Sequence, residues 1–254
     1  DLTLIAGVDA ANNTGVIYAQ GNLNGSTITA IADTDIQMAT SWGTVEADVL
    51  DMTLNNNGSI RISKIIPYTG TTVTVTADVQ GGEGYISFSQ GDVSSPQEDE
   101  GMIVGVDGIN AGTGVVSLIN YSGSIDGGGA VIGSSGVKIA AQTSVGSTSQ
   151  LHTVTGALDG RALAGGMSIW NAGDLIIGDT SWQTGLSATG DIDLVNDGSI
   201  TVNETVTTTG AANIQLMAFG TSSALAVNAD VTSGSGEIKL LSNTTTTVDP
   251  GASV

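Results

Sequence analysis

The sequence predicts an all-β fold, a right-handed parallel β-helix (solenoid) of about eleven imperfect coils. Short segments alternate apolar and polar residues with a period of two, which is typical of strands with one buried face. Similar segments recur along the chain at a nearly constant interval, as they do in repeat proteins. The chain also has 37 Gly but only 3 Pro, so turns are easy to form and few strands are interrupted.

The repeat is clearest in the last third of the chain. Its apolar anchors are Ile192, Ile214 and Ile238, which lie 22 and 24 residues apart and are each followed by a polar residue and a leucine. We expect these three side chains to be buried and stacked in one column. Less regular units of the same motif are found at 2–4, 17–19, 36–38, 60–62, 86–88, 116–118, 137–139 and 167–169.

Most units have a second strand-like segment half a period later, as at 73–75, 200–202 and 225–227. Turn dipeptides such as Asn57-Gly58 and Asp197-Gly198 lie where a coil would change direction. A sandwich would need regular hairpins, and a propeller repeats at about 40 residues with aromatic signatures. The strongest similarity here is between segments one period apart, which favours equivalent strands stacked in parallel.

We expect a single domain over residues 1–254, with irregular loop insertions near 89–113 and 141–166. The first contains Pro96 and ends in the acidic run 98–100, so it is either a solvated loop or a site for a cation or a partner. Within the second, residues 157–164 have a pattern that would permit one short turn of helix.

The charge excludes several partners. With 25 acidic and 5 basic residues the formal net charge is −20, and the cations are scattered. A nucleic-acid interface needs a basic stripe, and docking on anionic lipid needs a basic patch, so we expect neither. No stretch is long enough and apolar enough to span a membrane, so we expect no membrane insertion. An acidic surface favours solubility and permits weak calcium binding.

Two pairs of carboxylates, Asp33 with Asp35 and Asp191 with Asp193, would lie on one face of a strand. Such a pair is compatible with calcium binding or with acid–base work on sugars. The alternative is that these residues face outward simply because they alternate with the apolar core. We expect the latter, and hence a protein that is not an enzyme and has no catalytic, cofactor or metal site.

The remaining candidates are single side chains. His152 is the sole histidine and lacks partners for a metal site or a local triad motif, so we expect it to pack in a loop or on the surface. Trp42, Trp170 and Trp182 would suit a carbohydrate platform or would be structural. Sequons for N-glycosylation begin at Asn12, Asn24, Asn57, Asn120, Asn203 and Asn243. A sequence rich in Asn, Ser and Thr generates such sequons by chance, and the alternative is that these residues are glycosylated.

The segments 190–194, 213–216 and 234–240 resemble the repeats of filamentous-haemagglutinin-like and other large bacterial surface adhesins. The resemblance implies a secreted protein, extracellular or on the cell surface, that serves as part of an adhesin shaft or as a filament subunit. The implied partners are a host-cell or glycan receptor and further copies of the chain. The alternative is a carbohydrate-active β-helix enzyme or a carbohydrate-binding module.

The chain starts without an initiator Met inside a strand-like pattern, and residues 244–248 are strand-like as well. We therefore expect either a fragment of a longer rod or a processed subunit that associates end to end, because uncapped solenoid edges recruit further strands. The net charge would oppose such stacking unless salt or calcium screens it.

Overall fold

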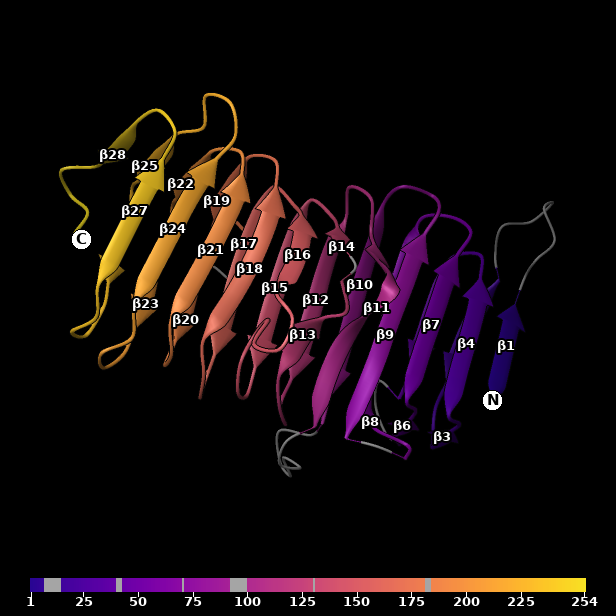
Figure 1. The fold of residues 1–254 in the computed structure, drawn as a ribbon. Coiled ribbons are helices and arrows are strands. Elements are labelled where there is room, and N and C mark those ends of the chain that lie inside the picture. The colour runs from indigo at the N-terminus through magenta and orange to yellow at the C-terminus, as the bar shows by residue number, and fades with distance from the viewer. Residues whose placement is uncertain (7–14, 40–42, 70, 92–99, 130, 181–183) are drawn as a thin grey trace.

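The computed structural model describes residues 1–6, 15–39, 43–69, 71–91, 100–129, 131–180 and 184–254. These residues form strands and turns, with no helix, and the strands stack in parallel as a β-solenoid. Figure 1 shows the strands side by side along a rod, with the two termini at opposite ends. In the described part of the chain no helix is long and apolar enough to cross a membrane.

One wall of the rod is a 12-stranded sheet, here called sheet A. Its strands pair in the order given, and β13 (Ile125–Gly127) adds to β11 off this path. The strands are β1 (Leu2–Ala6), β4 (Thr27–Ala32), β7 (Val49–Leu54), β9 (Thr72–Val79), β11 (Gly101–Asn110), β14 (Val131–Gly133), β16 (Leu151–Val154), β18 (Met167–Ala172), β21 (Ile192–Asp197), β24 (Ile214–Phe219) and β27 (Ile238–Ser242).

The other walls belong to a 16-stranded sheet, here called sheet B. Its main path is β2 (Val16–Ala19), β5 (Asp35–Met38), β8 (Gly58–Ile66), β10 (Gly84–Gln90), β12 (Val115–Asn120), β15 (Gly136–Ala141), β17 (Ala157–Ala162), β19 (Leu175–Ile177), β22 (Ile200–Val202), β25 (Leu225–Val227) and β28 (Thr246–Val248).

Sheet B divides toward both ends of the rod. The long strand β8 pairs with β5 and also with β6 (Val45–Glu46), which pairs in turn with β3 (Leu23–Asn24). Likewise β17 pairs with β19 and with β20 (Leu186–Ala188), which continues through β23 (Val206–Thr208) to β26 (Val231–Thr232). The C-terminal coils therefore have three strands each, one from sheet A and two from sheet B.

The core lies between these walls and is built by the expected alternation. In β24 the residues Ile214, Leu216 and Ala218 are buried, while the residues between them face outward. Ile192 pairs with Ile214, and Ile214 with Ile238, so the predicted column is confirmed. Ile238 is only half-buried because β27 is the last strand on the path of sheet A.

The units of the motif do not all occupy equivalent places in the coils. Ile36, Ile60 and Ile86 stack in sheet B, whereas Met167 and Ile192 stack in sheet A. Both walls bury alternate apolar side chains, so their strands look alike in sequence even though they belong to different columns. The expected eleven coils are approximate, because the solenoid makes about nine turns over the described residues.

The stretches expected to be irregular contribute strands to both walls. Residues 141–166 contain β16 and β17, and residues 89–113 contain all of β11. The helical turn suggested for 157–164 is wrong, because Ala157–Ala162 is the strand β17 and pairs with β15 over its whole length. Residues 92–99, which include Pro96 and most of the acidic run, lie outside the described residues.

A buried polar column runs through sheet A beside the apolar core. Thr153 pairs with Asn171, and Asn171 with Asn196, and all three are fully buried. The Thr153 hydroxyl donates to Asn171 Oδ1 (2.8 Å), and Asn171 Nδ2 donates to Asn196 Oδ1 (2.8 Å). Asn196 Nδ2 then donates to the carbonyl of Ser199 (2.9 Å) in the turn that follows β21. These buried side chains therefore supply hydrogen-bond partners to one another and to the backbone of that turn.

Candidate functional site

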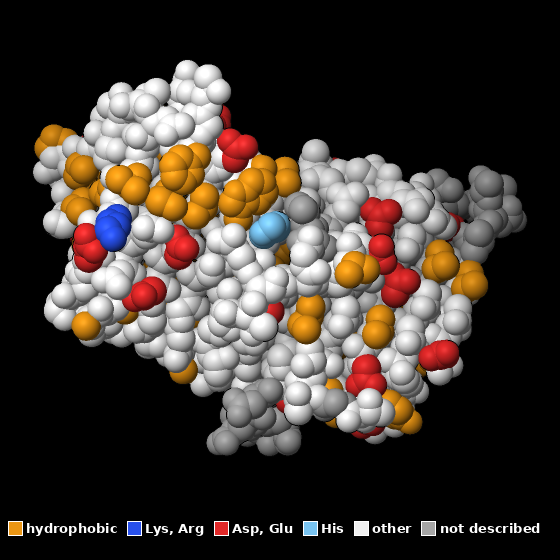
Figure 2. All heavy atoms as spheres, in the orientation of Figure 1, with side chains coloured by type: hydrophobic (Ala, Val, Ile, Leu, Met, Phe, Trp, Pro, Cys, Tyr) orange, Lys and Arg blue, Asp and Glu red, His pale blue; other side chains and the backbone are white. Residues whose placement is uncertain are grey.

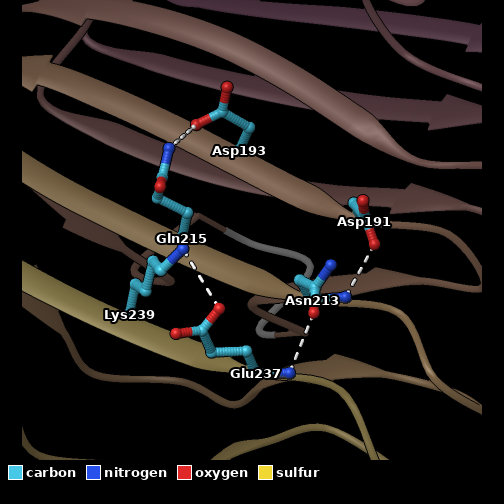
Figure 3. Close-up of polar contacts among 6 residues, drawn as sticks. All are labelled: Asp191, Asp193, Asn213, Gln215, Glu237 and Lys239. Atoms are coloured by element: carbon cyan, nitrogen blue, oxygen red, sulfur yellow. Dashed lines mark hydrogen bonds and ion pairs between the residues drawn. The ribbon is translucent and has the colours of Figure 1, made fainter.

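The carboxylates Asp191 and Asp193 lie at the start of β21, on the outer side of sheet A (Figure 3). Asp193 Oδ1 accepts a hydrogen bond from Gln215 Nε2 (2.8 Å) on the neighbouring strand β24. Asp191 Oδ1 accepts one from the backbone N–H of Asn213 (2.7 Å). Each carboxylate therefore binds a group one coil further along the chain.

This contact repeats at the same corner in the next coil. Asn213 Oδ1 accepts the backbone N–H of Glu237 (2.9 Å), so Asp191 and Asn213 form successive steps of one ladder. Glu237 itself pairs with Lys239, with Nζ and Oε2 3.1 Å apart. A side-chain oxygen that accepts a backbone N–H satisfies a donor which the turn would otherwise leave open.

The same device recurs at other corners of the rod. Asp35 accepts the N–H of Ser59 (3.1 Å), Asp174 that of Ser199 (2.9 Å), and Asp230 that of Ser253 (2.8 Å). The second predicted pair is used in this way too, because Asp33 Oδ1 accepts from Asn55 Nδ2 (3.1 Å) in the next coil. Many acidic residues of this chain thus hold one coil to the next.

Two shallow hollows flank the ridge formed by Asp191 and Asp193. One has a volume of about 310 Å³ and is lined by Gly146, Ser168 and both carboxylates, among others. The other, of about 230 Å³, extends over Gln215 and Lys239. Hydrogen-bond acceptors dominate this surface, so it suits neutral ligands rich in hydroxyl groups better than anions. Among the described residues, no group of three or more His, Asp or Glu is placed to hold a metal ion.

His152 and Trp170 face outward from adjacent strands of sheet A. They are direct neighbours in the register of β16 and β18, with ring centroids 5.3 Å apart and planes tilted by 48°. Trp170 is half-buried, as is His152. Trp42 and Trp182, which were predicted with Trp170 as a possible platform, lie outside the described residues.

The sequons are placed differently from one another. Asn24, Asn57, Asn203 and Asn243 are exposed at turns or strand ends. Asn120 is buried, and its Nδ2 donates to the carbonyls of Glu100 (2.7 Å) and Ser124 (2.8 Å). The Asn120 side chain is therefore not accessible to a glycosylating enzyme in the folded protein. Asn12 lies outside the described residues.

Sequence reasoning missed a line of apolar side chains on the outer side of sheet A. Trp170 pairs with Val195, Val195 with Met217, and Met217 with Leu241. A signal for it exists, since each of the three C-terminal repeat units has a second apolar residue directly after the buried leucine. Two consecutive apolar residues break the alternation and put one of them on the outside.

Sequence reasoning also missed a buried polar cluster on sheet B. Ser117, Lys138 and Asp159 are register neighbours on β12, β15 and β17, and all three are buried. Asp159 accepts hydrogen bonds from the Thr180 hydroxyl and from the N–H groups of Thr184 (3.2 Å) and Gly185 (2.7 Å). These contacts hold Thr180, Thr184 and Gly185 against the outer side of sheet B.

The chain matches no protein-family model, and no curated protein or solved structure matches it significantly.

Proposed function

We propose that the chain is an extracellular structural or adhesive β-solenoid, either part of the shaft of a surface adhesin or a subunit of a filament. The observation that carries this proposal is that polar side chains of one coil form hydrogen bonds with the next coil. Asp35, Asp174, Asp191 and Asp230 each accept a backbone N–H from the following coil. These four acidic residues are thus accounted for by construction of the rod, as in a protein whose task is mechanical.

The two ends of the stack support the same proposal. β1 and β27 each pair on one side only within sheet A, and Leu2, Leu4, Ile238 and Leu240 are only partly buried there. Unpaired strand edges accept further strands. We propose that they are covered by more of the same rod, supplied either by the same chain or by another copy.

Electron microscopy of the purified protein, with and without calcium and at low and high salt, tests this assembly. Rods longer than one chain, formed when salt or calcium screens the charge, are the expected result. Particles of one chain's length under every condition would contradict end-to-end association.

A second candidate function, glycan binding, rests on Trp170 and the hollow beside Asp193. An aromatic ring beside hydrogen-bond acceptors suits a sugar, which offers an apolar face and several hydroxyl groups. A glycan array with the native protein and with Trp170→Ala tests it. Binding that the substitution abolishes would favour a carbohydrate-binding module. Product release from a glycan panel, lost in Asp193→Asn, would favour the enzyme instead.

A further inference from the structure

A contiguous apolar surface lies outside the core, on the C-terminal half of sheet A (Figure 2). Its central line, here called the apolar column, consists of Trp170, Val195, Met217 and Leu241, with His152 at its inner end. Figure 2 shows this surface as an orange band that runs from the pale blue histidine toward the C-terminal end of the rod. Exposed apolar surface of this kind usually marks an interaction site.

The side chains beside the column widen it. Val154 and Phe219 are 47% and 42% exposed, and they project from the outer side of β16 and β24, one step further along the strands than His152 and Met217. Leu241 is 47% exposed. Large apolar groups are therefore presented to solvent over five successive strands of sheet A.

The N-terminal half of the same wall is different. There the outward-facing residues of the corresponding column are Thr3, Thr29 and Asp51, which are register neighbours on β1, β4 and β7. The strand geometry is the same in both halves, so the fold does not require the apolar column. Some other interaction explains why these outward positions are apolar.

Charge restricts the partner. Asp193 precedes the column on β21 and Asp197 follows it, so carboxylates lie on both sides of Val195. The one basic residue on the strands of sheet A is Lys239, which pairs with Glu237. The other four basic residues are on β8, β15 and β17 of sheet B. Unless ions screen the charge, a second copy of this chain, with its net charge of −20, would be repelled from this face, whereas a cationic partner would be attracted to it.

Spacing restricts the partner further. Successive side chains of the column are about 4.8 Å apart along the rod, because neighbouring strands have that separation. One turn of an α-helix advances about 5.4 Å, whereas side chains on one face of a strand are about 6.8 Å apart. Over the four steps from His152 to Leu241 a helix would drift by only about 2.4 Å, and an extended segment by about 8 Å.

We infer that the apolar column binds a basic amphipathic α-helix of another protein, about four to five turns long, which lies along the rod axis. Its apolar side chains contact Trp170, Val195, Met217 and Leu241, and its Lys or Arg side chains reach Asp193 and Asp197. This inference rests on the proposed adhesive role and specifies the chemistry of a receptor for it.

The test uses the whole chain and three labelled 18-residue peptides in fluorescence anisotropy. The first is a helix with leucines on one face and lysines on both flanks. The second has glutamates in place of the lysines, and the third has the composition of the first with the leucines scrambled. The first peptide should bind at least tenfold more tightly than either of the others, and its binding should weaken as NaCl rises from 50 to 500 mM. Equal binding of the lysine and glutamate helices, or of the scrambled peptide, overturns the inference.

Matched protein variants locate the binding surface. Met217→Ser, at the centre of the column, should weaken binding of the lysine helix about tenfold. Ile5→Ser removes a more exposed apolar side chain from β1 of the same sheet, outside the column, and should leave affinity unchanged. Equal losses in both variants, whose fold is checked by circular dichroism, overturn the proposed location.

Two competitors test whether the apolar column binds a glycan or a lipid surface instead of a helix. Neutral oligosaccharides or phosphatidylcholine vesicles should leave the bound helix in place, and displacement by either would assign the column to a glycan or to a lipid surface and overturn the inference. The outcome is independent of the electron microscopy above, because a single isolated chain can bind the helix and because rods can form without binding it.

Discussion

The C-terminal coils, from β18 to β28, and the central coils, from β9 to β17, both pair their strands in parallel, but the number of residues between paired strands varies more in the central coils. In the C-terminal coils the paired residues Met167, Ile192 and Ile214 are 25 and 22 positions apart. In the central coils Ile86 pairs with Val116, 30 positions later, and Val116 pairs with Val137 only 21 positions later. Register is therefore fixed by apolar columns, while loop length is free to vary, at little thermodynamic cost.

Two carboxylates, one from each region, show the same contrast, and replacing them should give the largest effect. Asp159, in the central region, is fully buried and accepts three hydrogen bonds, whereas Asp191 is exposed and accepts one. Asp159→Ala leaves buried donors unsatisfied, so it should lower the free energy of unfolding by about 4 kcal/mol. Asp191→Ala should lower it by about 1 kcal/mol. Urea denaturation followed by circular dichroism measures both losses of stability, and equal losses would show that the two carboxylates contribute equally.

One glycine from each region extends the comparison, with a smaller expected effect on stability. A Cβ on Gly114 would lie 1.7 Å from the carbonyl oxygen of Gly84 in the preceding coil, so the two backbones are in direct contact there. Gly210 has φ near +64°, and a Cβ added there would meet no atom within 4 Å. Gly114→Ala should cost about 2–3 kcal/mol because the coils must move apart, and Gly210→Ala about 1 kcal/mol from backbone strain alone.

Thermal denaturation of the two glycine variants compares them directly. A Gly114→Ala protein as stable as the Gly210→Ala protein would mean that the central coils can separate without loss of packing.

The smallest expected effect concerns pH. Burial raises the pKa of Glu100 above its usual value of 4.5, and the Gln90 side chain partly opposes this shift. The folded state then holds this proton more tightly than the unfolded state, so the contribution of Glu100 to stability increases as pH falls through its folded pKa toward 4.5. Glu100→Gln should remove that contribution, measured as the change in melting temperature between pH 7 and pH 5. An unchanged pH dependence in the variant would assign the effect to other groups.

The sequence was sufficient for the solenoid and for the Ile192 column because these coils repeat their apolar anchors at nearly equal spacing. It was insufficient for the assignment of each unit to a wall, since Ile86 and Ile192 occupy identical patterns in different sheets. Only the three-dimensional pairing separates them, because both walls share one core. The strand at 157–162 was mistaken for a helical turn because Gly160 and Ala162 fit inward positions that larger residues fill elsewhere.

The surfaces were predicted less completely than the core. The outward position of Asp191 and Asp193 follows from alternation, but their partners Asn213 and Gln215 are set by coil-to-coil register, which spacing fixes only roughly. The apolar column follows from the same register, since Trp170 and Val195 are 25 residues apart in the chain. Asp159 was missed because its donors come from a connecting segment rather than from a neighbouring strand.

The side-chain ladder at the corners has a mechanical consequence. The bonds from Ser199 N–H to Asp174, from Asn213 N–H to Asp191 and from Glu237 N–H to Asn213 all join one coil to the next, as do the backbone bonds of the sheets. Every interface between coils carries tension applied along the rod, so the coils detach one after another rather than together. Each coil that detaches releases about 24 residues, or roughly 80 Å of extended chain. A rod built in this way lengthens stepwise under load, and every step absorbs work.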